Sequence, residues 1–212
     1  MGRRRSDDFG ISDEDIALIA KEVGVDMPGV VKRTIIAVVN EAIDESQRKA
    51  INYITERVNL TPDYIRRHLK VTQRAGPNSD TAILSGTVRP VLLSRFDMRQ
   101  EYRETRDKRK RSGNRVRSGM SVAVKPGVRH TMASAFAIKL KMSGVTGLAV
   151  RPNQVNQSQL QKKEWAEFGR LGYAVLHGPS VDQLFKRAIA NGDVEPSLDE
   201  MAEAFARRIA NV

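Results

Sequence analysis

Apolar residues recur along the chain with two different periods, and the change of period separates predicted helices from predicted strands. In the first part the period is helical. Residues 12–23 begin with Ser12 at an N-cap position and three acids in the next turn, followed by apolar side chains three or four apart, until Gly24 ends the pattern. This pattern predicts a short amphipathic helix.

A second, much longer helical pattern begins at Pro28 and runs from Val30 to about Val58 without another proline or glycine. Thirty helical residues would form a rod of roughly 45 Å. A compact domain of this size does not cover such a rod on all sides, so we expect part of its apolar stripe to contact another subunit. The residues expected at that interface are Val31, Ile35, Val38, Val39, Ile43 and Ile54.

A third helix is predicted to begin at Thr61, Pro62 and Asp63, which supply an N-cap, a proline at the first helical position and an acid in the first turn. We expect this helix to continue through YIRRHLKV, with His68 exposed on its polar side.

From residue 81 the period changes to two. Residues 81–93 and 121–127 alternate apolar with small or polar side chains, which predicts two strands. Residues 133–144 and 147–152 predict two further strands, joined as an antiparallel hairpin at Ser143-Gly144.

The C-terminal part returns to helices. The apolar run YAVLHGPS (173–180) ends with Ser180 as the N-cap of a helix that Gly192 closes, and Ser197 with Glu200 forms a capping box before a last helix. The order predicts an α+β fold with N-terminal helices, a central antiparallel β-sheet or partial barrel, and C-terminal helices. Its expected parts are an N-terminal extension with a short helix (1–27), an α+β domain (28–192) and a capped C-terminal helix (193–212).

The composition restricts which kinds of bond and site this chain can form. The 212 residues include no cysteine, so disulfides, thiolate zinc sites and cysteine nucleophiles are excluded. Aromatic residues make up 5%, which predicts an aliphatic core. No apolar run is long enough to span a bilayer, and no apolar segment follows the charged start MGRRRSDD, so we expect a soluble protein that is not exported.

Positive charge is concentrated in one stretch. The formal net charge is +11, and residues 103–119, RETRDKRKRSGNRVRSG, contain eight cations and two acids. Glycines and serines punctuate this stretch, which favours a long inter-strand loop or a projecting hairpin. No aromatic residue lies between Tyr102 and Phe136, so we expect a partner to be met as charge, without base stacking or sequence readout. The cations are Arg103, Arg106, Lys108, Arg109, Lys110, Arg111, Arg115 and Arg117.

Residues with catalytic or ligating chemistry are scattered. His68, His130 and His177 are more than 45 residues apart and match no metal-binding spacing, and no phosphate-binding loop or nucleophile elbow is present. The acid clusters at Asp7-Asp8, at 13–15 and at Asp199-Glu200 lie near chain ends or helix starts, where capping explains them. We therefore expect no catalytic, cofactor-binding or metal-binding site, and no enzyme.

Several segments together resemble the prophage minor tail protein Z family, the lambda-like tail-completion proteins of long-tailed bacteriophages. They are the long helix with its continuation to LKV, the strand LSGTVRPVLLSRF, the pair SVAVKPG and SAFAIKL, GLAVR, and the closing YAVLHGPSVDQLFKRA, which is the most characteristic. The resemblance covers roughly residues 30–190, and none of its motifs is catalytic.

The resemblance implies a structural virion protein, made in the host cytoplasm, that completes the head-proximal end of the tail and joins it to the head or neck. It implies a homo-oligomeric ring, with a hexamer favoured, through whose lumen the DNA passes. The implied partners are the tail terminator, tail tube and head-tail connector proteins, with packaged double-stranded DNA nearby, and no membrane or cofactor. The basic stretch would face the DNA channel or a neighbouring ring.

Two other interpretations remain open. The chain could be a non-specific DNA- or RNA-binding protein that uses residues 103–119, or an unrelated α+β domain with a solvated basic loop.

Overall fold

The computed structural model describes residues 4–10, 21, 28–104, 115–141, 143–151, 171–192 and 194–210. The chain divides into two compact units. The first contains Met1–Thr55, Thr61–Arg89 and Ser180–Val212, and the second contains Glu56–Leu60 and Pro90–Pro179. The boundaries expected after residues 27 and 192 do not coincide with this division. The predicted short helix at 12–23 lies almost entirely outside the described residues.

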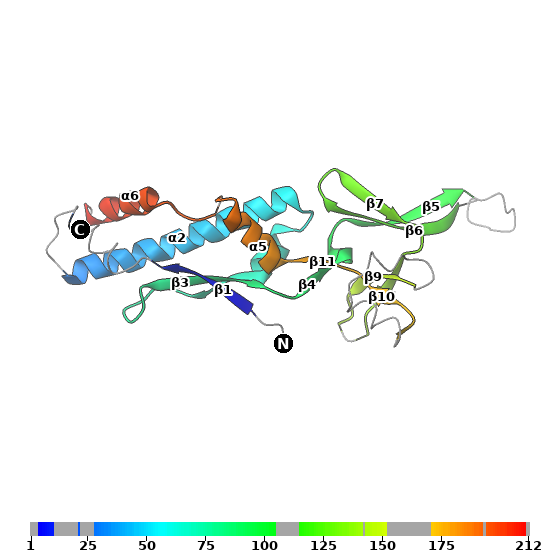
Figure 1. Cartoon of the computed structure of the whole chain (residues 1–212), viewed down its shortest axis with the longest axis horizontal. Helices are drawn as coiled ribbons and strands as arrows, with labels where there is room; N and C mark the ends of the chain where they lie inside the picture. The colour runs from blue at the N-terminus through cyan, green and yellow to red at the C-terminus, as the bar shows by residue number, and fades with distance from the viewer. Residues whose placement is uncertain are drawn as a thin grey trace. The chain divides into compact units, whose positions relative to one another are not determined.

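The first unit is built around α2, a helix of 30 residues over Pro28–Arg57 whose last two residues are counted in the second unit; its span is as the uninterrupted helical pattern predicted. In Figure 1, α6 lies along one side of α2 and the strands β1 and β3 lie on the other. The elements around α2 are α3 (Pro62–His68), α5 (Val181–Ala190), α6 (Leu198–Ile209) and the antiparallel sheet β1-β3-β2 (Arg4–Gly10, Thr81–Thr87 and Leu69–Gln73).

The apolar stripe of α2 is buried within the single chain. Its six expected interface residues are 1–8% exposed. The polar side of the helix also bonds to neighbouring segments: Asn40 exchanges two hydrogen bonds of 3.0 Å with the backbone of Ala75, and Gln47 donates to the carbonyl of Leu69 at 2.8 Å. The stripe therefore needs no second subunit to cover it, which removes the reason for assigning Val31, Ile35, Val38, Val39, Ile43 and Ile54 to a subunit interface.

The predicted third helix is shorter than its sequence pattern suggested. Its N-terminus is as expected, because the side chain of Thr61 accepts a hydrogen bond from the backbone of Tyr64. The helix ends at His68, however, and Leu69 takes an extended conformation that starts β2. Pairing with β3 outweighs the helical pattern of these last residues. His68 is half-buried and stacks on Tyr64 at 4.1 Å between ring centres, so it is not the exposed residue that we expected.

The N-terminal segment contributes a strand where an extension was expected. Residues 4–10 form β1, which pairs with β3 along its whole length, from Arg4 opposite Thr87 to Gly10 opposite Thr81. Asp7 and Asp8 are therefore strand residues, and helix capping does not explain them.

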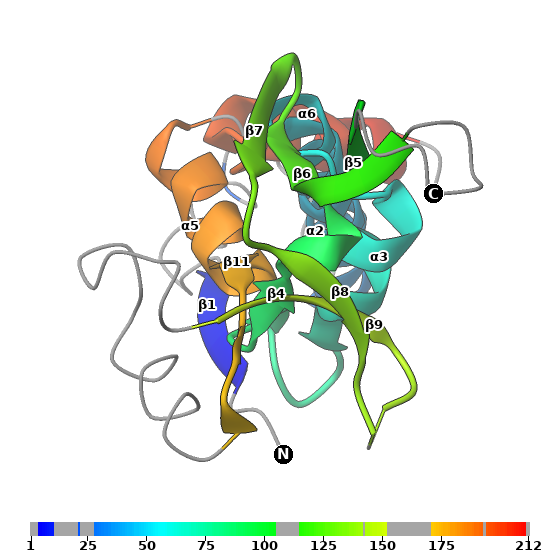
Figure 2. The ribbon, with the colours of Figure 1, turned by 90° about the vertical axis from the view of Figure 1, so that its right-hand side faces the viewer.

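The second unit contains three small sheets. They are β5-β6-β7 (Met98–Glu104, Arg115–Lys125 and Val128–Met132), β10-β9-β8 (Ala174–Val175, Thr146–Val150 and Phe136–Lys139) and β11-β4 (His177–Ser180 and Pro90–Leu92, followed by the 3-10 turn η1 at Leu93–Arg95). Figure 2 shows β8 and β9 side by side. The predicted turn at Ser143-Gly144 joins them, with Gly144 at a φ of +66°.

The fold is α+β, as predicted, but its strands do not form one central sheet. They form four small sheets and no closed barrel within the described part of the chain. The cap predictions were confirmed: Ser180 and Ser197 each form a complete capping box, and Gly192 has a φ of +74° where α5 ends. None of the helices among the described residues combines the length and apolar character needed to span a bilayer.

Candidate nucleic-acid interface

The basic stretch joins two paired strands. Its first residues, Arg103 and Glu104, end β5, and its last residues, from Arg115 to Gly119, begin β6. The two strands pair in antiparallel register, with Arg103 opposite Val116. The two ends of the stretch therefore pair as the stem of a hairpin. A projecting hairpin was one of the two expected arrangements, and a long inter-strand loop was the other. Five of its cations, Arg106, Lys108, Arg109, Lys110 and Arg111, lie outside the described residues.

The hairpin stem, which we define as residues 102–104 and 115–117, places an aromatic ring among the cations. Tyr102 is directly opposite Arg117, and Glu104 is opposite Arg115. Residues opposite each other, and residues two apart, share a face of a sheet, so these four side chains lie on one face. The guanidinium carbon of Arg115 is 5.9 Å from the centre of the Tyr102 ring.

The aromatic and charged side chains of the stem are exposed to solvent. Tyr102 is 50% exposed, and Arg103, Arg115 and Arg117 are exposed as well. Arg103 lies on the opposite face from Tyr102 because successive strand residues alternate. The face that carries Tyr102 therefore offers two cations, Arg115 and Arg117, against one acid, Glu104, and Arg103 adds a third cation on the opposite face.

Gly119 anchors β6 at the base of the stem. Its φ is +119°, and a Cβ at this position would lie 2.3 Å from the carbonyl oxygen of Met132, at the end of β7. The Gln100 amide donates to the Gly119 carbonyl at 2.6 Å. The pairing register shifts between Glu101 and Tyr102, which marks a bulge next to this glycine. The conformation of residue 119 thus fixes where the stem begins.

A compensated charge cluster lies below the stem, on the same sheet. Arg129 forms an ion pair with Asp97 and donates to Ser121 Oγ at 3.1 Å, and Arg99 pairs with Asp97 at 3.2 Å. Ser121, which is fully buried, also bonds to Glu101. Cations and acids are balanced in this cluster, so we assign it to holding the three strands together.

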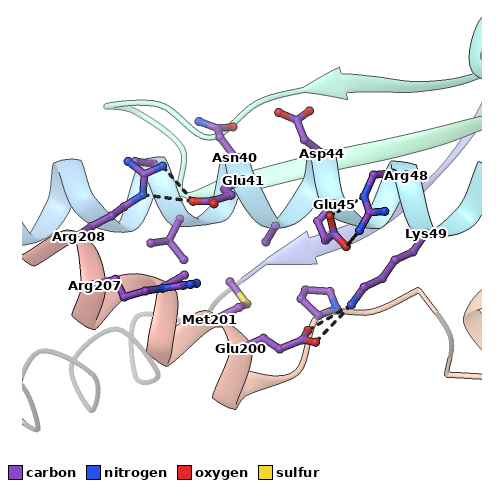
Figure 3. A pocket seen from close by; sticks show the side chains of 15 residues that line it. Asn40, Glu41, Asp44, Glu45, Arg48, Lys49, Glu200, Met201, Arg207 and Arg208 are labelled. Carbon is purple, nitrogen blue, oxygen red and sulfur yellow. Dashed lines mark hydrogen bonds and ion pairs between the residues drawn. The ribbon is translucent and has the colours of Figure 1, made fainter.

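The second surface that could serve as a site is a groove of about 840 Å³ between α2 and α6 (Figure 3). Arg208 pairs with Glu41 at 2.9 Å and Lys49 pairs with Glu200 at 3.3 Å, so the two helices run antiparallel. The lining is Ala37, Val38, Asn40, Glu41, Ala42, Asp44, Glu45, Arg48, Lys49, Pro196, Glu200, Met201, Ala204, Arg207 and Arg208.

The charges of this groove neutralise one another. The pKa of Glu200 is lowered by the hydrogen bond from the Ser197 backbone and then by Lys49. The pKa of Glu45 is lowered by the hydrogen bond from Arg48. A balanced set of ion pairs carries no net attraction for a charged ligand, so we interpret the groove as part of the helix-helix packing.

Within the part of the chain that the structure describes, no three histidines or acids gather where they could hold a metal ion. His68 lies in α3, His130 in β7 and His177 in β11.

The residue that sequence reasoning missed is Tyr102. Its place in the sequence, just before the basic stretch, gave no sign of a role, because only the strand register brings it opposite Arg117. No protein-family model, no curated protein and no solved structure matches this chain.

Proposed function

We propose that the chain is a non-enzymatic structural component of the virion of a long-tailed bacteriophage. In this role it completes the head-proximal end of the tail and joins it to the head or neck, and DNA passes through the lumen of a ring of copies. The observation that carries the proposal is the order of elements: one helix of 30 residues, a series of short antiparallel strands, and two short strands followed by a helix over residues 174–190. This order agrees with the resemblance to tail-completion proteins.

The hairpin stem supports a position beside DNA. Double-stranded DNA carries one negative charge per roughly 1.7 Å of its axis, so an exposed cationic hairpin is attracted to it without reading sequence. Arg103, Arg115 and Arg117 are presented on paired strands, which hold them in place better than an isolated loop would. Electrostatic complementarity of this kind also suits docking onto an acidic neighbouring ring.

A ring of this protein would use surfaces other than the stripe of α2. Because that stripe is buried inside the chain, we expect each copy to fold before it assembles. Head-to-tail contacts between folded copies close into a ring when the rotation between neighbours allows it. A sixfold ring is favoured by the resemblance alone.

The test is attachment to tail tubes that lack this protein. We expect negative-stain images to show added density at the head-proximal ends of the tubes, and at no other place. Gly29→Ala is a suitable control variant, because a Cβ there meets nothing within 4 Å. Tubes that stay bare when the folded protein is in excess would contradict the proposal.

The alternative function, non-specific binding of DNA or RNA by the basic stretch, is favoured by the cations on the stem. Replacing Lys108, Arg109, Lys110 and Arg111 with serine separates the two functions. Tight DNA binding near about 150 mM salt that the variant loses would favour the alternative. Weak binding with unchanged attachment to tubes would favour the virion role.

A further inference from the structure

We infer that the hairpin stem is a binding surface for single-stranded nucleic acid, with Tyr102 as its base-stacking residue. This goes beyond the proposed virion role, which requires only attraction between charges. It differs from the expectation that the basic stretch meets its partner without base stacking. That expectation came from the sequence alone. In the sequence, Tyr102 is 13 residues from Arg115 and 15 residues from Arg117, the two arginines that share its face of the sheet.

The chemistry of the surface fits a single strand. Proteins that bind single strands without sequence preference combine cations that follow the backbone with exposed aromatic rings on which bases stack. Tyr102 is half exposed, and Arg117 lies directly across the strand from it. The guanidinium carbon of Arg115 lies over the ring, 5.9 Å from its centre, so a base would stack on the part of the half-exposed ring that this arginine leaves open. In a duplex the bases are already stacked on each other, so the ring offers nothing to double-stranded DNA.

The charge of the surface favours nucleic acid over a protein partner. On the face with Tyr102 the stem has two cations and one acid, and Arg103 adds a cation on the opposite face. Over residues 103–119 the sequence contains eight cations and two acids. Such an excess would suit a polyanion, whereas protein interfaces tend to be depleted of charge at their core.

The experiment measures fluorescence anisotropy of labelled strands of about 20 nucleotides, with dT, rU and duplex DNA as three separate probes. We expect Tyr102→Ala to weaken binding of the single strands on the order of tenfold and to change duplex binding less than twofold. Tyr102→Phe should restore single-strand binding, because phenylalanine keeps the ring. The dT and rU probes show whether DNA or RNA is preferred.

Matched charge variants separate stacking from charge. Arg117→Ser and Lys125→Ser remove one exposed cation each from the same strand, β6, at opposite ends. We expect Arg117→Ser to weaken all three probes and Lys125→Ser to weaken none. In addition, an oligonucleotide with 5-iodo-deoxyuridine should form its photocrosslink on the peptide that contains Tyr102.

Two outcomes would overturn the inference. One is that Tyr102→Ala lowers single-strand and duplex binding by the same factor, or lowers neither. The other is that the variant binds all three probes normally but no longer attaches to tail tubes, which would make the stem a protein contact. Failure of the wild-type chain to attach to tubes would contradict the virion role and leave this inference untouched.

Discussion

At the scale of single residues, one close helix-strand approach in the first unit depends on a glycine. Gly86 lies in β3 where α5 crosses it, and a Cβ at this position would be 2.7 Å from the Cα of Asp182. The atom that it would meet belongs to the backbone, so rotation of a side chain cannot relieve the clash. Gly86 therefore sets how closely helix and strand approach.

We predict that Gly86→Ala destabilises the protein by about 1–3 kcal/mol, because α5 must move away from β3. Urea unfolding followed by circular dichroism measures the change. Gly29→Ala, in the first turn of α2 with open space around its Cβ, should be neutral or slightly stabilising. Equal stability of Gly86→Ala and the wild-type chain would show that α5 and β3 have room to separate at no cost.

Residue-scale predictions from the sequence succeeded where the signal is local. The caps at Thr61, Ser180 and Ser197 were predictable because a cap and its partner are three residues apart. The contact of Gly86 with Asp182, and of Tyr102 with Arg115, joins residues that are distant in sequence. Such contacts are fixed by strand register and helix packing, which a single sequence does not reveal.

At the scale of elements, the attachment of α6 to α2 combines burial with exposed charge. Phe205 and Met201 are buried, while the Lys49–Glu200 pair lies at the surface. Glu200 has a second role, because its Oε2 accepts the backbone N–H of Ser197 at 3.2 Å and completes the cap of α6. The Glu200 carboxylate thus caps the start of α6 and also holds α6 against α2 through Lys49.

The lowered pKa of Glu200 predicts a pH-dependent contribution to stability. Because the pKa in the folded state lies below the reference value of 4.5, the contribution is present above that value and is lost as the pH falls through the folded-state pKa. Glu200→Gln should therefore lower the thermal midpoint at about pH 7, and the difference from wild type should shrink toward about pH 3.

The control for this prediction is Glu203→Gln, which removes the same charge from an exposed position of α6. Thermal midpoints of the three proteins across the pH range give the comparison. A difference between wild type and Glu200→Gln that stays constant with pH would mean that ionisation of Glu200 contributes nothing.

The helices of this fold could be predicted more fully than its strands. The span of α2 and the starts of α3, α5 and α6 follow from uninterrupted periodicity and from caps. The strand β2 was read as helix, and β1 was read as an extension, because both acquire their structure by pairing with β3. The partner of β1 is more than seventy residues away, so the composition of β1 carries little of that pairing, and in β2 the helical pattern continuing from α3 hid the nearer partner.

At the scale of the whole molecule, the long helix finds its cover inside its own chain. The expectation of an open stripe assumed that a compact domain of this size does not cover a rod of about 45 Å on all sides. Instead, the sheet β1-β3-β2 and segments near the C-terminus pack along α2, so its apolar residues are buried without a partner.

We predict that the isolated chain keeps its helix content when it is diluted until only monomer remains. Size-exclusion chromatography establishes the monomer, and circular dichroism at the same concentration measures helicity. If the stripe of α2 needed a second subunit, dissociation would expose it and the helical signal would fall. A loss of helicity on dissociation would contradict this prediction and would support the subunit interface that the sequence predicted for the stripe of α2.

The pairing of β1 with β3 has a practical consequence for preparing this protein. A chain trimmed to begin after Gly10 would leave one edge of β3 with unpaired N–H and C=O groups along seven residues. Open edges of this kind recruit strands from other molecules. Shortening the N-terminus to improve crystals or expression would therefore be expected to yield sticky, poorly soluble material, and affinity tags are better placed at the opposite terminus.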